Sequence, residues 1–211
     1  MSYFSEPKYP IEGLTDRYEE WINYDLVKRA LGGFEDKKSP GPDGIKPVVF
    51  KYFNRSVLEY IRFIYCASIF LNYTPRLWTE TDVIFIPKPG KDAYNTAKSF
   101  RPISLSNYLL KGLERLVGWR MDNALLSRPL HPKQHGFMKN KSTESALSNT
   151  CNYIERFVFR NEYALGVFLD ISSAFDSISP EHIKSSLLKH GGETDLVDWY
   201  YNYLMLSLIH I

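Results

Sequence analysis

The segment FLDISSAFDSI occupies residues 168–178 and follows the apolar run EYALGV that starts at Glu162. An apolar run of this length, bounded by polar residues, predicts a central β-strand over residues 162–171. Asp170 stands at the end of that strand, where a carboxylate can leave the core and coordinate a hard metal ion through oxygen. Asp176 suits a helix cap or a surface charge at least as well as a metal ligand. The segment therefore predicts a sheet that presents one metal-binding carboxylate.

Length and composition bound the class of protein. The chain has 211 residues, of which 44% are hydrophobic and 24% charged, which excludes disordered, collagen-like and coiled-coil proteins. Its two cysteines lack metal-ligand spacing, so we expect neither a disulfide framework nor a zinc site. We therefore expect a reducing, intracellular compartment. We expect no leader and no membrane partner, because the most apolar stretch, residues 57–70, contains Glu59 and Arg62 and predicts a core helix.

Charge is distributed in blocks along the chain. Residues 1–36 carry a net charge of −4, residues 37–83 of +3, residues 84–141 of +8 and residues 142–211 of −5. Neutralising phosphates is the main sequence-independent source of nucleic-acid affinity, so the basic block suits a groove for a phosphate backbone. A solvated basic face with no ligand explains the same block equally well.

Glycine, proline and capping residues divide the chain into expected elements. Lys37–Pro47 predicts a loop of nearly fixed shape, because its Pro and Gly residues allow no regular element. We expect a buried strand over 81–88, a second extended piece over 100–105, and helices over 15–31, through Phe53, over 56–71, from Ser106 or Asn107 onward, and over 142–160, 180–190 and 194–205.

Five segments in this order resemble the reverse transcriptase of non-LTR retrotransposons, particularly the jockey-like group. They are SPGPDGI at 39–45, DVIFIPKPGKD at 82–92, SFRPISLSN at 99–107, KQHGFMKNKSTESAL at 133–147 and FLDISSAFDSI at 168–178. The resemblance covers about Trp21 to Met205 and implies an α+β fold, the fingers and partial palm of a right-hand polymerase. A group II intron maturase is a second member of this class that fits less well.

The resemblance also implies a nucleotide site. Lys88 and Arg101 match the fingers residues that grip the triphosphate of the incoming dNTP, and the bland alternative is that they are two of many solvated basic residues. Asp170 matches the first metal-binding aspartate of the palm. Phe175 matches the aromatic gate that excludes a 2′-hydroxyl, although without the resemblance it would be an ordinary core aromatic. The backbone amides of Ile171, Ser172, Ser173 and Ala174 match those placed against the triphosphate.

A second set of residues is expected to contact the RNA template and the DNA primer. Gln134, Gly136 and Phe137 match the QxGF element near the start of the palm, and Lys139 and Lys141 follow it. The loop 39–45 matches a block near the point where the template enters. It suits a stiff connector equally well, because Pro-Gly loops are usually architectural.

The expected domains are a helical lead-in over 1–36, fingers over 37–141, the start of a palm over 142–205 and a non-native tail over 206–211. The family's double-aspartate hairpin and thumb do not follow, so we expect an N-terminal fragment that is inactive alone and whose 162–171 strand lacks sheet partners. The complete enzyme would use two Mg²⁺ ions, or Mn²⁺ in their place, and the family implies action in the nucleus. The alternatives are a non-catalytic nucleic-acid-binding module and an unrelated helical interaction domain; the sequence sets no oligomeric state.

Overall fold

The computed structural model describes residues 13–90, 93–125, 131–171 and 177–208, and it divides the chain into two compact units. The first unit comprises residues 1–124 and 180–211, and the second comprises residues 125–179. Helices and a single two-stranded sheet make up the described part, which agrees with the expected mixture of α and β structure. Within that part, no helix combines the length and apolar character needed to cross a lipid bilayer.

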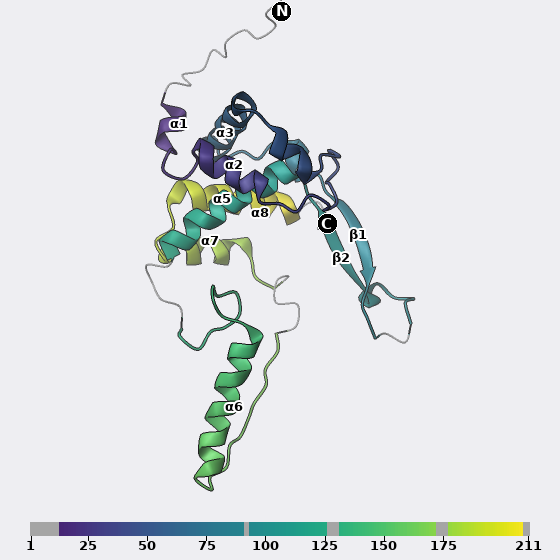
Figure 1. The fold of residues 1–211 in the computed structure, drawn as a ribbon, viewed down its shortest axis with the longest axis vertical. Helices are drawn as coiled ribbons and strands as arrows, with labels where there is room; N and C mark the ends of the chain where they lie inside the picture. The colour runs from purple at the N-terminus through teal and green to yellow at the C-terminus, as the bar shows by residue number, and fades with distance from the viewer. Residues whose placement is uncertain (1–12, 91–92, 126–130, 172–176, 209–211) are drawn as a thin grey trace, which may run out of the picture. The chain divides into compact units, whose positions relative to one another are not determined.

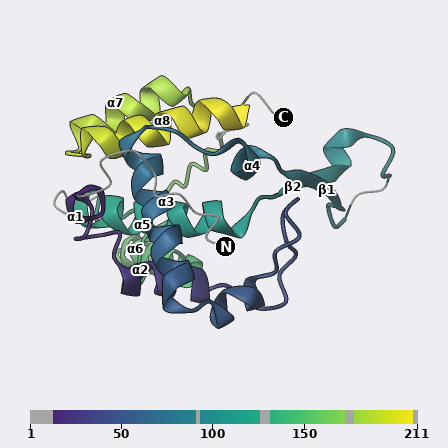
Figure 2. The same cartoon turned by 90° about the horizontal axis from the view of Figure 1, so that it is seen from above.

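The first unit is a helical body from which a β-hairpin extends (Figure 1). Its helices are α1 (Leu14–Arg17), α2 (Tyr24–Gly32), the 3₁₀ segment η1 (Pro47–Tyr52), α3 (Arg55–Phe70), α4 (Arg76–Thr79), α5 (Tyr108–Leu125), α7 (Pro180–Lys189) and α8 (Thr194–Leu208). The strands β1 (Asp82–Pro87) and β2 (Phe100–Leu105) pair antiparallel, with the short 3₁₀ turn η2 (Ala97–Ser99) directly before β2. Figure 2 shows α7 and α8 lying side by side in this unit.

One hydrophobic cluster holds the helical body together. Tyr65 of α3 and Trp199 of α8 are both 0% exposed, and the Trp199 indole donates a 3.0 Å hydrogen bond to the Ser68 hydroxyl of α3. The Tyr65 hydroxyl donates to the carbonyl of Leu109 at 2.6 Å, which ties α3 to α5. Burial of apolar surface supplies most of the stabilisation, and the satisfied polar groups fix the orientation of the helices. The cluster also includes Trp21, Ile22, Val27, Leu31, Leu58, Ile69, Trp78, Leu110, Leu113, Leu116 and Leu196.

The helix expected over residues 15–31 is interrupted, so that part of the prediction is wrong. α1 ends at Arg17 and α2 begins at Tyr24, where the Asn23 side chain accepts a 2.9 Å hydrogen bond from the Leu26 amide. The turn between them buries Trp21 and Ile22, which a continuous helix would direct to different faces. Arg62 of α3 fastens this turn by donating to the carbonyl of Ile22 at 3.0 Å. The expected end of the helix at residue 31 is confirmed within one residue, because α2 ends at Gly32.

The second unit contains α6 (Thr143–Phe159) and the polar loop before it. Ser142 caps α6 in a capping box with Ser145, because each side chain accepts a hydrogen bond from the other's backbone amide. The helices expected over 56–71, 142–160, 180–190 and 194–205 are confirmed within a few residues, and α8 continues to Leu208.

Two strand predictions need correction. The strand over 81–88 forms but is exposed on both faces, because among the described residues it pairs with β2 alone. Residues 162–171 form no strand and are exposed, with Phe168 at 94%. A strand requires a neighbour for its backbone hydrogen bonds, and the only pairing among the described residues is that of β1 with β2.

Candidate nucleotide and nucleic-acid interface

The β1–β2 hairpin brings together the two residues expected to grip the triphosphate. In the register, Ile86 pairs with Arg101, and the Lys88 amide donates to the Ser99 carbonyl at 2.8 Å. Lys88 directly follows β1, so these two contacts bring Lys88 and Arg101 to the same end of the hairpin. Diagonal neighbours across an antiparallel pair have Cα atoms about 7–8 Å apart, within reach of one ligand for side chains this long.

The hairpin end holds Lys88 through several contacts. The Lys88 ammonium donates to the Lys98 carbonyl at 2.9 Å, and the Tyr94 hydroxyl donates to the Lys88 carbonyl at 2.8 Å. Ser99, which is 5% exposed, donates from its hydroxyl to the Ala93 carbonyl at 2.9 Å. A phosphate oxygen would replace the neutral carbonyl acceptor of Lys88 with an anionic one, which makes a stronger hydrogen bond. The hairpin therefore presents two cations that suit a polyphosphate.

The loop 39–45 is fixed against the base of the hairpin. The Asp43 carboxylate accepts from the Ile45 amide at 3.0 Å in a local turn, and the Tyr108 hydroxyl donates to the Ser39 carbonyl at 3.2 Å. A Cβ on Gly41 would lie 2.5 Å from the Asn107 side-chain oxygen, so only glycine allows this close approach. The loop is therefore rigid, as both of its expected roles require.

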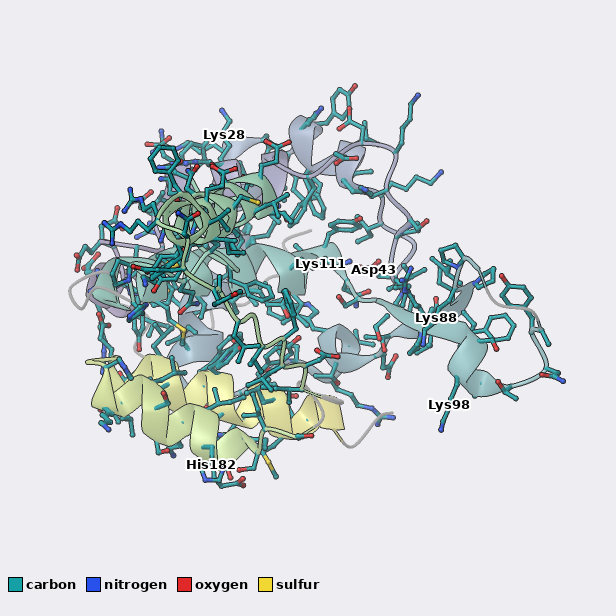
Figure 3. All side chains as sticks on the ribbon, turned by 90° about the horizontal axis from the view of Figure 1, so that it is seen from below. Lys28, Asp43, Lys88, Lys98, Lys111 and His182 are labelled. Carbon is teal, nitrogen blue, oxygen red and sulfur yellow. The ribbon has the colours of Figure 1, made fainter. Side chains whose placement is uncertain are left out.

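Lys111 of α5 adds a cation beside this loop. Its ammonium lies 4.5 Å from the centre of the Tyr108 ring, a cation–π contact. Partial burial lowers the pKa of Lys111, while the Glu114 and Asp43 carboxylates oppose that shift. Figure 3 shows Lys111 and Asp43 near the base of the hairpin and Lys88 and Lys98 along it. The sequence analysis did not select Lys111, whose place next to Asp43 depends on a contact across the fold.

Asn107 was expected only as a helix cap, and the structure gives its side chain a different role. Its carbonyl accepts the first helical hydrogen bond of α5, from Lys111 at 3.1 Å, but its side-chain amide donates to the Leu77 carbonyl of α4. Its side-chain oxygen lies 3.5 Å from the Asp43 amide, a long hydrogen bond. No local pattern predicts these partners, because they lie 30 and 64 residues away in the sequence.

In the second unit, the QxGF element forms a compact loop before α6. The Lys141 ammonium donates to the carbonyls of Gln134, at 2.8 Å, and of Pro132, so this cation holds the loop together. The Gln134 side chain donates to the Gly136 carbonyl at 3.3 Å. Phe137 has a φ of 58°, a strained backbone conformation for a bulky residue, and its aromatic ring is 97% exposed. Of the expected nucleic-acid contacts, Phe137 and the exposed Lys139 are available to a ligand.

Asp170 is exposed in the segment without regular structure, beside the equally exposed Ile171. Ser172, Ser173, Ala174, Phe175 and Asp176 lie outside the described residues, so the structure does not test their expected roles. Among the residues that the structure does describe, no three His, Cys, Asp or Glu side chains gather into a group that could hold a metal ion. The described residues therefore supply one candidate metal ligand and do not by themselves form a two-ion site.

Comparison with known proteins identifies the family. Residues 86–210, more than half of the chain, match the family described as "Reverse transcriptase (RNA-dependent DNA polymerase)". The protein named "Probable RNA-directed DNA polymerase from transposon BS" of Drosophila melanogaster is 30% identical over 80% of this chain and 18% of its own length. The RNA-directed DNA polymerase from mobile element jockey of the same organism is 30% identical over 74% of this chain and 17% of its own length.

A third relative is the "Retrovirus-related Pol polyprotein from type-1 retrotransposable element R1" of Bradysia coprophila, 30% identical over 74% of this chain and 15% of its own length. The chain thus spans less than a fifth of the length of these relatives. The chain belongs to the reverse transcriptase family, and the expected resemblance to the polymerases of non-LTR retrotransposons is confirmed.

Proposed function

We propose that the chain supplies the fingers and the first part of the palm of an RNA-directed DNA polymerase, which adds dNTPs to a DNA 3′ end on an RNA template during retrotransposition. The observation that supports this proposal is the β1–β2 hairpin, in which Arg101 pairs with Ile86 and Lys88 directly follows β1, with its amide bonded to the Ser99 carbonyl. A guanidinium clamps phosphate oxygens in a bidentate manner and an ammonium adds a point charge, and both stabilise the negative charge that shifts during phosphoryl transfer. The family implies that this takes place in the nucleus.

The metal requirement belongs to the larger enzyme. Polymerases of this kind use two divalent ions, Mg²⁺ or Mn²⁺, which activate the attacking oxygen and steady the leaving group. Asp170 would contribute one carboxylate to them. We propose that the 211-residue chain does not polymerise by itself and depends on further carboxylates of the polymerase, because a single aspartate cannot hold two ions.

Template and primer binding would draw on both units. Phe137 offers a ring on which a base can stack, a contact worth about 1–3 kcal/mol per base, and Lys139 offers a cation to the backbone. The loop 39–45 adds a rigid surface beside Lys111.

Primer extension on an RNA template with Mg²⁺ and dNTPs tests the proposal. The comparison uses the 211-residue chain, a longer polymerase that contains it, and the longer form with Asp170→Ala. Glu162→Ala is the matched control, because Glu162 is an exposed carboxylate in the same segment. Extension by the longer form and by the control, lost in Asp170→Ala and absent from the short chain, is the expected result. Full extension by the Asp170→Ala form contradicts the assignment of the metal ligand.

A non-catalytic nucleic-acid-binding module is the second candidate, favoured by the net charge of +8 over residues 84–141. Affinity that rests on phosphate contacts falls steeply with salt, by a factor of about 10³–10⁵ between 50 and 200 mM for 6–10 contacts. This candidate predicts salt-sensitive RNA binding that dNTP and Mg²⁺ leave unchanged, together with no primer extension by the longer form.

A further inference from the structure

We propose that Asn107 is a positioning residue that sets the angle of the β1–β2 hairpin and so places Lys88 and Arg101 for the incoming nucleotide. The inference rests on the proposed function in one respect, that these two cations bind the dNTP. It assigns Asn107 no contact with nucleotide, template or metal.

Among the described residues, α4 and α5 attach the two ends of the hairpin to the helical body. α4 leads into β1 and α5 follows β2, while both faces of the strands between them are exposed. α4 is anchored in the core by Trp78, which is 8% exposed and packs edge-on against Tyr65 at 5.8 Å between ring centres. α5 is anchored by its own apolar face, including Leu110 and Leu113. The orientation of the hairpin therefore depends on how these two attachments are held together.

Asn107 joins the two attachments directly. It stands between β2 and α5, it is 2% exposed, and its side-chain amide donates to the Leu77 carbonyl of α4. A buried amide with a satisfied donor is costly to disrupt, since an unpaired buried polar group costs about 1–3 kcal/mol. The side-chain oxygen makes the long contact with Asp43, so the loop 39–45 is fastened more weakly to the same residue.

A small change at this point is amplified along the strands. Each strand has six residues, which at about 3.3 Å per residue makes an arm of about 20 Å. A tilt of about 5° at the base then moves the far end by about 1.7 Å. Lys88 and Arg101 lie at that far end. Hydrogen bonds to a phosphate oxygen form over donor–acceptor distances of about 2.7–3.2 Å, so a displacement of this size would impair binding of the triphosphate.

Two independent variants disturb the junction in different ways. Asn107→Asp keeps the shape of the side chain but removes the donor to Leu77. Gly41→Ala changes no polar group, yet its Cβ would lie 2.8 Å from the Asn107 amide nitrogen and 2.8 Å from the Ser106 carbonyl carbon, which are backbone atoms that cannot rotate away. Gly118→Ala in α5 is the control, because nothing lies within 4 Å of the added methyl group.

The test measures both nucleotide kinetics and hairpin position in the longer polymerase. Spin labels at Lys98→Cys on the hairpin and Tyr60→Cys on α3 report the distance between hairpin and body, and both positions are exposed. The background carries Cys151→Ser and serine in place of every exposed cysteine in the added part of the polymerase, while Cys66 is buried and stays. Asn107→Asp and Gly41→Ala should shift or broaden this distance distribution. Both variants should also raise the KM for dNTP at least about tenfold with kcat changed less than about threefold, and Asn107→Asp, which lies outside the loop 39–45, should leave template–primer affinity as in the control.

Other outcomes contradict either the role of Asn107 or the proposed function. An unchanged distance distribution in a folded variant overturns the inference, and so does a changed distribution with an unchanged KM for dNTP in an active enzyme. A wild-type enzyme that adds no nucleotide refutes the proposed function, and the spin-label distances alone then decide whether Asn107 sets the hairpin. Loss of folding in both variants, with the control folded, contradicts a role limited to positioning.

Discussion

Gly112 in α5 lies at a close approach between helices of the first unit. A Cβ at this position would lie 2.5 Å from the Tyr65 hydroxyl and 2.6 Å from a Leu31 methyl group, and both of those side chains are fully buried. Real Cβ atoms essentially never come that close to a neighbour. Gly112→Ala therefore forces α2, α3 or α5 to move, whereas Gly118→Ala in the same helix meets open space.

Comparing the two alanine variants isolates the cost of that crowding. Replacing a glycine in a helix interior by alanine contributes about 1 kcal/mol of helix propensity, and this gain is common to both positions. Overpacking a close-packed core costs about 1–3 kcal/mol, and only Gly112→Ala incurs it. We expect Gly118→Ala to be more stable than the parent and Gly112→Ala to be about 1–3 kcal/mol less stable than Gly118→Ala. For a chain of this length each kcal/mol corresponds to about 2–4 °C in Tm.

Urea denaturation of the parent, both variants and Tyr65→Phe provides the measurement. Tyr65→Phe removes the hydroxyl that the new methyl group would meet, although by itself it costs about 1–3 kcal/mol because the Leu109 carbonyl loses its donor. The double variant should be more stable than the sum of the two single effects by at least about 0.5 kcal/mol. Additive effects, or a Gly112→Ala variant as stable as Gly118→Ala, would refute this account of the packing.

Three further predictions concern reactivity, core and site. Burial raises the pKa of the Cys66 thiol to about 12 from its usual 9.0, so iodoacetamide should modify the exposed Cys151 before Cys66. Because the Cys66 thiol ionises at a lower pH in the unfolded chain than in the folded one, the free energy of unfolding should fall as the pH rises from about 9 towards 12. Trp199→Phe should destabilise by about 1–3 kcal/mol in thermal denaturation, because it shrinks a fully buried ring and leaves the Ser68 hydroxyl without its donor. Arg101→Ala should raise the KM for dNTP more than tenfold in primer extension by the longer form, with partial recovery in Arg101→Lys; equal KM values would contradict a role in triphosphate binding.

Helix positions could be predicted from the sequence wherever local signals agree. Ser142, Pro180 and Thr194 stand at helix starts and Gly32 at a helix end, and the helices occur there within a few residues. Capping and glycine effects act within one turn, so they can be recognised without the rest of the fold.

Burial of the strands could not be predicted in the same way. The pattern around Ile84 and Val167 indicates residues that suit a pleated surface, and it says nothing about whether a partner is present. β1 finds one partner and stays exposed, while residues 162–171 find none among the described residues and form no strand. Side-chain burial in a sheet is set by other segments, which can lie anywhere in the polymerase.

In the candidate site too, local sequence predicts some features, while contacts between distant residues determine others. The hairpin that brings Lys88 near Arg101 follows from two apolar runs joined by a polar loop, so the sequence contains what is needed to predict it. The role of Asn107 cannot be predicted from the sequence, because its side chain bonds to distant partners on α4 and in the loop 39–45 instead of capping the nearby helix. The placement of Asp170 within a metal site stays a prediction.

α6 is a 17-residue helix with no buried residue; it is held by its capping box, its own hydrogen bonds and the contacts of Ser145 and Asn149 with His135 of the preceding loop. An isolated helix of that length is marginal in water even with favourable residues, so its amides should open through local helix–coil fluctuations. Amides of α3 and α5, whose apolar faces lie in the core, can exchange only when much of the first unit opens. Deuterium uptake should therefore be fast at the amides of α6 and slow at those of α3 and α5. If a bound nucleic acid slows exchange at the α6 amides, the nucleic acid contacts the second unit.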